Sequence, residues 1–259
     1  MLGRKIYRIW VAFWFFFIFL LIYPFFVLFI QKKSWHRYGH FLNKLWAHLF
    51  FPMVFMPTKV VLKFKPDTKK NYIYCANHSS YMDIPSLAFA LPGHFLFIGK
   101  ASLTKLPLFG YMFRNLYIPV ERESRKSKYE TMLRCYQALE DNKSIAIFPE
   151  GTIPKLHNPK LIPFKEGAFR MAIEKQVPVI PVTIPYNYII LPDNGKFMPK
   201  RHRMKVIIHE PIETRGLTLD NLEELKRKTF EIIEAELKKE VNDYDKISVK
   251  TSIPLDVNP

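Results

Sequence analysis

The sequence predicts an α/β protein with a largely parallel, mixed sheet flanked by helices and preceded by N-terminal membrane-associated helices. Short apolar runs and helical patterns alternate along residues 58–241, as is typical of strands joined by helices. An uncharged apolar segment precedes this region, and 49% hydrophobic content over 259 residues is enough for a sizeable core. We therefore expect a membrane-anchoring region at 1–57, an α/β domain at 58–241 and a polar C-terminal tail at 242–259.

The N-terminal region contains a segment long enough to reach across a bilayer. Ile9–Ile30 carries no charge over 22 residues, and as a helix it would be about 33 Å long. Half of these residues are aromatic, and Pro24 predicts a kink. Aromatic rings favour the membrane interface, so a tilted or re-entrant insertion stays open beside a full span. A buried core helix is the alternative, but soluble cores rarely need so long an apolar run.

A second segment, Phe41–Met56, has apolar residues at helical spacing and polar residues on another face. This pattern predicts an amphipathic helix at a membrane surface. The linking stretch, Lys32–His40, is basic and aromatic. His36 and His40 have the i, i+4 spacing of a metal pair, but no third ligand is near them. We interpret them as interfacial histidines and expect no metal.

The α/β domain follows from the alternation of the two patterns. We expect strands at Val60–Phe64, Tyr72–Ala76, Phe95–Ile98, Leu116–Val120, Ser144–Phe148, Val179–Ile184 and Met204–His209. We expect helices at Ile84–Leu91, Leu106–Phe113, Lys126–Glu140, Glu166–Lys175 and Asn221–Val241. Asp220 is the expected N-cap of the last helix, with Glu223 completing a capping box.

The charge balance limits the classes of partner. The chain has 39 Lys and Arg against 23 Asp and Glu, a net charge of +16. This excess predicts a polyanionic partner, which could be nucleic acid, an anionic membrane or an acidic carrier or substrate. A nucleic-acid-binding protein would explain the charge but not the long apolar segment. The two cysteines, Cys75 and Cys135, lack metal-type spacing and favour a reducing compartment.

Three polar clusters directly follow predicted strands: Asn77-His78, Glu121-Arg122 and Pro149–Thr152. The carboxyl ends of parallel strands meet at one edge of a sheet, where open α/β sheets place their ligand crevice. We therefore expect these clusters to lie together, although polar residues after strands are in most cases only loops.

His78 and Asp83 could form a base and its orienting carboxylate. Residues five apart on a helix diverge, so the two side chains meet only if the chain turns between them. The alternative, that Asp83 stabilises a helix N-terminus and His78 lies in a polar turn, is equally compatible with the spacing. No G-x-S-x-G, Walker or G-x-G-x-x-G motif is present. A base without a protein nucleophile suggests that the substrate supplies a hydroxyl, while Gly151 and Arg122 could bind an anion.

These residues resemble the glycerolipid acyltransferases, the family that contains 1-acylglycerol-3-phosphate acyltransferases. The resemblance covers residues 77–183 and keeps the family order of four blocks. They are NHSSYMD (77–83), KLP with Gly110 followed by YIPVER (105–122), FPEGT (148–152) and VPVIPVT (177–183), with FKEGAF (164–169) between the last two.

The resemblance implies a glycerol-3-phosphate acyltransferase-like fold and one-step acyl transfer to the hydroxyl of 1-acyl-sn-glycerol-3-phosphate, giving phosphatidic acid. His78 and Asp83 are the implied catalytic residues. The implied co-substrate is acyl-CoA or acyl-ACP, with no cofactor. The implied substrate-binding residues are Arg122, Glu150, Gly151 and Thr152, with Lys100 and Lys105 as further candidates.

The membrane prediction agrees with this activity, because a lysophospholipid acceptor stays in the bilayer. An acidic, cytosolic donor would place the domain on the cytoplasmic face of the membrane, with no role for nucleic acid. One departure concerns the third block, which usually continues with arginine, whereas Ile153-Pro154 follows here. Another lysophospholipid or a lyso-aminolipid is therefore an alternative acceptor. A basic nucleic-acid-binding or non-catalytic membrane protein is the alternative of another class.

Overall fold

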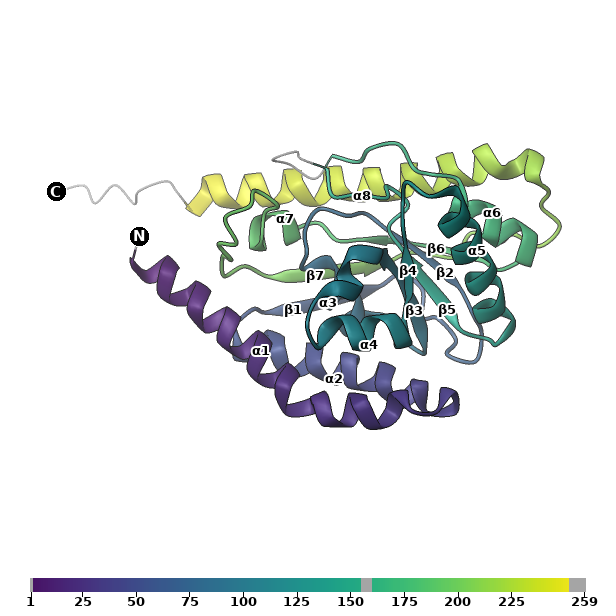
Figure 1. Cartoon of the computed structure of the whole chain (residues 1–259). Helices are drawn as coiled ribbons and strands as arrows, with labels where there is room; N and C mark the ends of the chain where they lie inside the picture. Colours follow the sequence, from purple (N-terminus) through teal and green to yellow (C-terminus); the bar gives the residue numbers. More distant parts are fainter. Residues whose placement is uncertain (1, 155–159, 252–259) are drawn as a thin grey trace.

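A seven-stranded sheet forms the middle layer of the fold, and helices cover both of its faces (Figure 1). The computed structural model describes residues 2–154 and 160–251. The strands are β1 (Thr58–Leu62), β2 (Ile73–Ala76), β3 (Phe95–Lys100), β4 (Ile118–Val120), β5 (Ser144–Ile147), β6 (Val179–Thr183) and β7 (Met204–Ile208). Their order across the sheet is β1-β7-β6-β2-β5-β3-β4.

Five adjacent strands, from β6 through β2, β5 and β3 to β4, run parallel to one another. β7 pairs antiparallel with β6, and β1 runs parallel to β7, so the sheet is mixed. This confirms the predicted α/β class with a largely parallel sheet. It also brings the carboxyl ends of β6, β2, β5, β3 and β4 to one edge, where the loops after these strands are neighbours.

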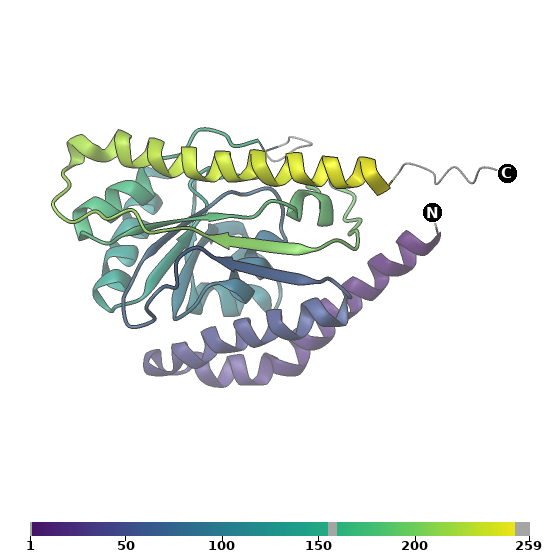
Figure 2. The same cartoon turned by 180° about the vertical axis from the view of Figure 1, so that it is seen from behind.

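The central strand β2 is fully buried, and its residues face two separate cores. Tyr74 and Ala76 lie in the core under α1 (Leu2–Ile30), α2 (His36–Met53), α3 (Asp83–Ala90) and α4 (Phe109–Leu116). Ile73 and Cys75 face the core under α5 (Arg125–Glu140), α6 (Gly167–Lys175) and α8 (Leu222–Thr251). Figures 1 and 2 show these two helical layers on opposite sides of the sheet. This alternation explains why the strand is apolar on both faces.

Helices α1 and α2 pack against each other as an antiparallel pair joined by the short 3-10 helix η1 (Lys33–Trp35). The ring of Phe15 lies 4.8 Å from that of Trp46, whose indole N–H donates to the Phe15 carbonyl over 3.2 Å. α1 bends along its length in Figure 1, as expected from a proline inside a helix.

The other side of α1 is apolar and exposed, as at Phe13, Phe17 and Leu21. In the described part of the chain, α1 alone is long and apolar enough to cross a membrane.

His40 is buried, and the prediction of an interfacial histidine is wrong for it. Only 3% of the residue is exposed, and its ring lies 4.9 Å from that of His94. α2 packs onto the sheet layer, and this removes His40 from water and lowers its pKa well below the usual value. His36 lies outside that core, with Nε2 3.3 Å from the Ile30 carbonyl oxygen. No three His, Cys, Asp or Glu side chains in the described residues are placed to hold a metal.

Both ends of α4 differ from the predicted helix at Leu106–Phe113. α4 begins at Phe109, after Pro107, because the preceding residues form the 3-10 helix η2 (Ala101–Lys105). α4 then continues to Leu116, which shortens the strand expected at Leu116–Val120.

The C-terminal helix also differs from expectation at both ends. Thr218, and not Asp220, provides the capping box, with Asn221 as its partner across the 3-10 helix η3 (Leu219–Asn221). α8 continues to Thr251 because no Gly or Pro interrupts residues 222–251. Ten residues of the predicted tail are therefore helical, and 252–259 lie outside the described residues.

Candidate active site

His78 and Asp83 form a hydrogen-bonded pair where β2 ends and α3 begins. His78 Nδ1 lies 2.8 Å from Asp83 Oδ2. The chain turns between them, and the Asp83 N–H donates to the Ser80 carbonyl over 3.1 Å. A carboxylate only accepts hydrogen bonds, so this contact places the imidazole proton on Nδ1. Nε2 is then the nitrogen that can accept a proton from a substrate.

Asp83 is fully buried, and donors surround its carboxylate. The backbone N–H groups of Ser79 and Ser80 donate to Oδ2 over 2.7 and 2.9 Å, beside the His78 ring. Oδ1 accepts from the side-chain amide of Asn187 over 2.8 Å. Asp83 therefore holds the turn that precedes α3 and contacts the His78 ring, as the interpretation of the two residues as a pair requires. Its hydrogen bonds to backbone N–H groups go to that turn and not to the first turn of α3.

Asn187 is a residue that the sequence patterns did not single out. It begins α7 (Asn187–Ile190), which is too short to show the spacing of apolar residues that predicts a helix, and it is fully buried. Its amide also donates to Ser86 Oγ over 2.9 Å. Asn187 therefore links the segment after β6 to the start of α3.

Asn77 joins the same two regions through backbone contacts. Its side-chain amide donates to the Ile184 carbonyl over 3.0 Å, and its side-chain oxygen accepts from the Ile184 N–H over 2.7 Å. Because Ile184 follows β6 directly, this paired contact holds the ends of β2 and β6 together beside His78.

Glu150 supports His78 from the neighbouring strand end, after β5. It is 2% exposed, and its Oε1 accepts from the His78 N–H over 2.8 Å while Oε2 accepts from the Ile162 N–H over 3.2 Å. Burial raises the Glu150 pKa to about 7, against the opposing effect of these two donors. Both oxygens are engaged inside the protein, which favours a positioning role over the direct acceptor contact expected from the resemblance.

The rest of the FPEGT loop lies over the histidine. The Phe148 ring stacks on the His78 ring with 3.9 Å between centroids. Gly151 has a positive φ of 73°, and a Cβ there would lie 2.8 Å from Cε and Nζ of Lys165. The positive φ favours glycine at this position, and the absence of a side chain lets the end of Lys165 lie against the turn. Lys165 brings an exposed ammonium group to the loop that lacks the usual arginine, a placement that the sequence did not predict.

Arg122, Lys100 and Lys105 lie along the same sheet edge but farther from His78. Arg122 follows β4, Lys100 ends β3 and Lys105 ends η2. Because β5 and β3 separate β2 from β4, the end of β4 is about 14 Å from that of β2 at ordinary strand spacing. The structure thus joins His78, Asp83 and Glu150 directly, and arranges the basic residues at a distance across the edge.

The amino-acid sequence of this chain is similar to those of known acyltransferases. The family model described as Acyltransferase matches residues 58–185. The chain is 30% identical over 191 residues to a chloroplastic 1-acyl-sn-glycerol-3-phosphate acyltransferase of Brassica napus, covering 73% of this chain and 54% of that protein. It is 34% identical over 180 residues to the 1-acyl-sn-glycerol-3-phosphate acyltransferase of Haemophilus influenzae, covering 65% of this chain and 70% of the relative. The chain spans about half the length of the Brassica relative.

The fold is also found in a solved structure. The 1-acyl-sn-glycerophosphate acyltransferase from Thermotoga maritima superimposes with a TM-score of 0.75 over 91% of this chain and 97% of that chain, at 24% identity. The architecture therefore extends beyond the matched motifs to most of the chain.

We expect Glu150→Gln to change the pH dependence of stability. The pKa of Glu150 is raised on folding, so its contribution is complete below its unfolded value of 4.5 and is lost as the pH rises through about 7. The free energy of unfolding of the variant relative to the native protein should therefore increase by about 3 kcal/mol between pH 4.5 and pH 8. Chemical denaturation in detergent measures it. Glu121→Gln, at an exposed position, is the control. If the free energy of unfolding relative to the native protein is independent of pH for both variants, the prediction is wrong.

We expect Asn187→Ala to leave the buried Asp83 Oδ1 without its donor. The free energy of unfolding should fall by about 2 kcal/mol. Asn194→Ala, at an exposed position in the loop that follows α7, should change it by less than about 0.5 kcal/mol. Equal effects of the two substitutions in denaturation experiments would show that the Asn187 contact adds nothing.

Proposed function

Because the chain belongs to the glycerolipid acyltransferase family, we propose that it moves a fatty acyl group from an acyl thioester to the free hydroxyl of 1-acyl-sn-glycerol-3-phosphate. The product would be phosphatidic acid, and the donor acyl-CoA or acyl-ACP. The observation that carries this proposal is the hydrogen bond of 2.8 Å between His78 Nδ1 and Asp83 Oδ2. The Asp83 carboxylate is buried and accepts hydrogen bonds at both oxygens, and His78 Nε2 remains for a substrate.

In the proposed reaction, His78 Nε2 accepts the proton of the acceptor hydroxyl as its oxygen attacks the thioester carbonyl carbon. The new C–O ester bond forms, the C–S bond breaks, and the leaving thiolate takes the proton from the imidazolium. Asp83 holds the ring orientation and stabilises the transient positive charge. No covalent enzyme intermediate and no cofactor are needed, because the acceptor supplies the nucleophile.

The acceptor phosphate would lie on the basic side of the sheet edge. An acceptor reaching from His78 toward Arg122 crosses the ends of β5 and β3. Gly151 and Thr152 follow β5, and Lys100 ends β3 with Lys105 beyond it, which supports their proposed contacts with the glycerol phosphate. The ammonium group of Lys165 beside Gly151 is a further candidate for this phosphate.

We also propose attachment to the cytoplasmic face of a membrane through α1 and α2, which form the proposed anchoring region at 1–57. The exposed apolar side of α1 supports contact with lipid, and the lysophospholipid acceptor would come from that bilayer. The net charge of +16 favours an anionic leaflet and an acidic donor.

Ile153 supports a second candidate acceptor. The third block continues with isoleucine where the family usually has arginine, so a lysophospholipid or lyso-aminolipid without a terminal phosphate is the alternative. The position of Lys165 favours the phosphate monoester, because its ammonium group can replace the missing charge at the same loop.

The activity is tested with purified full chain in lipid micelles, labelled acyl-CoA or acyl-ACP and a panel of lysolipids. We expect phosphatidic acid from 1-acyl-sn-glycerol-3-phosphate, and a rate lowered about 10²- to 10⁴-fold by His78→Ala. His48→Ala, an exposed histidine on α2, is the matched control. An unchanged rate for His78→Ala would overturn the mechanism, whereas product from a different lysolipid alone would change only the acceptor.

The charge of the acceptor site is tested with Arg122→Ala and Lys165→Met. We expect each to raise KM for 1-acyl-sn-glycerol-3-phosphate about tenfold, because each would remove one charge-assisted contact with the phosphate. KM for the acyl donor should stay the same. Lys196→Met, on an exposed loop outside the proposed acceptor site, is the control for the loss of positive charge. Unchanged acceptor KM would remove the substituted residue from the site.

A further inference from the structure

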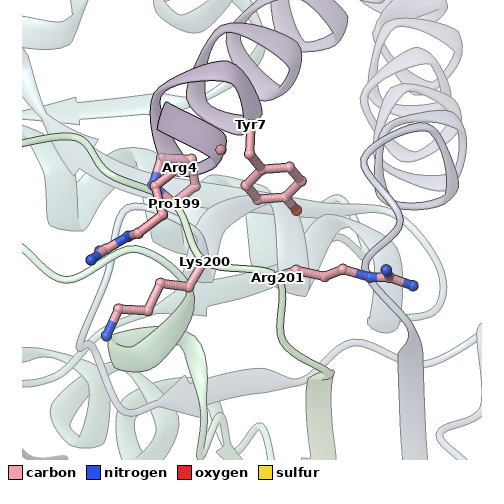
Figure 3. Close-up of a pocket in the computed structure, with 6 residues that line it drawn as sticks. Arg4, Tyr7, Pro199, Lys200 and Arg201 are labelled. Carbon is pink, nitrogen blue, oxygen red and sulfur yellow. The ribbon is translucent and has the colours of Figure 1, made fainter. Parts of the chain in front are cut away.

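A second basic site lies outside the proposed active site, at the N-terminal end of α1. Gly3, Arg4 and Tyr7 from the first turns of α1 line a pocket of about 420 Å³ with Pro199, Lys200 and Arg201 from the loop before β7. Figure 3 shows the charged ends of Arg4 and Lys200 on the same side of this pocket, while Arg201 extends to the other side. Two segments about 200 residues apart in sequence thus place two cations together.

Within the described part of the chain, the residues that line the pocket carry positive charge and no carboxylate. None of its lining residues is acidic. Among the side chains that the structure describes, at 2–154 and 160–242, neither Arg4 nor Lys200 forms an ion pair. Both are exposed, so they are free to contact an anion. A guanidinium and an ammonium on one side of a pocket match the oxygens of a phosphate group.

The walls of the pocket are fixed by hydrogen bonds to the end of α2. The Tyr7 hydroxyl donates to the Val54 carbonyl over 2.8 Å, and Arg201 Nε donates to the Phe55 carbonyl over 3.0 Å. On the next turn of α1, the Trp10 indole N–H donates to the Met53 carbonyl over 2.8 Å. These contacts hold α1, the end of α2 and the loop before β7 in one arrangement, so Arg4 and Lys200 are presented on a rigid base.

The position along α1 indicates which anion is available. Beyond Tyr7 and Trp10, the outer side of α1 exposes large apolar side chains through its length. Tyrosine and tryptophan favour the headgroup level of a bilayer, and apolar side chains favour the acyl-chain level below it. All the charged residues of α1 lie in its first turns together with Tyr7 and Trp10, and the helix carries no charge from Val11 to Ile30. This distribution of charge places the pocket at the depth of lipid phosphates.

We infer that this pocket binds the phosphate of an anionic membrane phospholipid, a resident lipid distinct from the acceptor and donor of the proposed reaction. Arg4 and Lys200 contact the phosphate oxygens, and the acyl chains lie along the exposed apolar side of α1. Two cations without an ion pair to any described side chain favour a lipid with a net negative headgroup over a zwitterionic one.

The bound lipid would also support the segment beside the proposed active site. The Lys200 N–H donates to the Ile190 carbonyl over 2.7 Å, which closes the loop at 191–199. At the start of this loop the Leu191 carbonyl accepts from Ser80 Oγ over 2.7 Å, and farther along it Phe197 stacks on Tyr81 with 5.8 Å between ring centroids. Ser80 and Tyr81 belong to the turn between His78 and Asp83, so one loop connects the lipid pocket to that turn.

Native mass spectrometry of the full chain in detergent tests the inference, with no acyl donor present. Phosphatidylglycerol, phosphatidylcholine and inorganic phosphate are titrated separately. We expect one tightly retained phosphatidylglycerol, with phosphatidylcholine weaker, and a Kd for phosphatidylglycerol raised at least about tenfold by Arg4→Gln with Lys200→Gln. The control is Lys5→Gln with Lys196→Gln, which also removes two positive charges from α1 and the loop before β7, but at residues that do not line the pocket. It should leave the Kd for phosphatidylglycerol unchanged.

A charge-retaining exchange, Arg4→Lys with Lys200→Arg, should keep phosphatidylglycerol binding within about threefold, since both positive charges remain to attract the anionic headgroup. Equal weakening by the two double Gln variants would overturn the inference, because it would reflect net charge alone. Displacement of the lipid by inorganic phosphate at matching concentrations would also overturn it, since the pocket would then be a free-anion site. These outcomes are independent of whether the chain transfers acyl groups.

Discussion

The buried carboxylate of Asp83 is the charge on which the arrangement of the candidate active site depends. An ionised carboxylate without water is strongly unfavourable unless hydrogen-bond donors replace the lost solvation. Here the donors are two backbone N–H groups of its own turn, the His78 ring and the amide of Asn187. Asp83 and Asn187 are 104 residues apart, so satisfying this one anion requires β2, α3 and the segment after β6 to be assembled together.

The parallel sheet supplies that assembly. β2 lies between β5 and β6, so the loops after three strands meet around His78. Glu150 from the β5 side fixes the His78 backbone, and Asn77 ties the β6 side through Ile184. The imidazole is therefore held through its backbone, through Nδ1 and by the stacked Phe148 ring, leaving Nε2 for the proposed proton transfer. Such fixed orientation is what a general base requires of its scaffold.

Two proposed lipid sites share this scaffold. The proposed acceptor site would lie along the ends of β2, β5, β3 and β4, and the proposed resident-lipid pocket lies where the start of α1 meets the loop before β7. The loop at 191–199 contacts the turn between His78 and Asp83 and ends at Lys200. In these proposals, basic residues serve two separate sites, one for the lipid that reacts and one for a lipid of the surrounding bilayer.

Four features can be recognised from the amino-acid sequence: the α/β class, the apolar N-terminal segment, the strand ends that carry His78, Arg122 and Glu150, and the acyltransferase resemblance. These features are encoded locally, in periodicity and in short motifs, and so they can be recognised without a structure. Only the folded chain shows that His78 and Asp83 meet, that Asn187 donates to the Asp83 carboxylate and that Lys165 lies beside Gly151. It also buried His40, which had been expected at the membrane interface. Each of these depends on distances between residues far apart in the chain, or on which side of a helix is packed, and no local pattern specifies either.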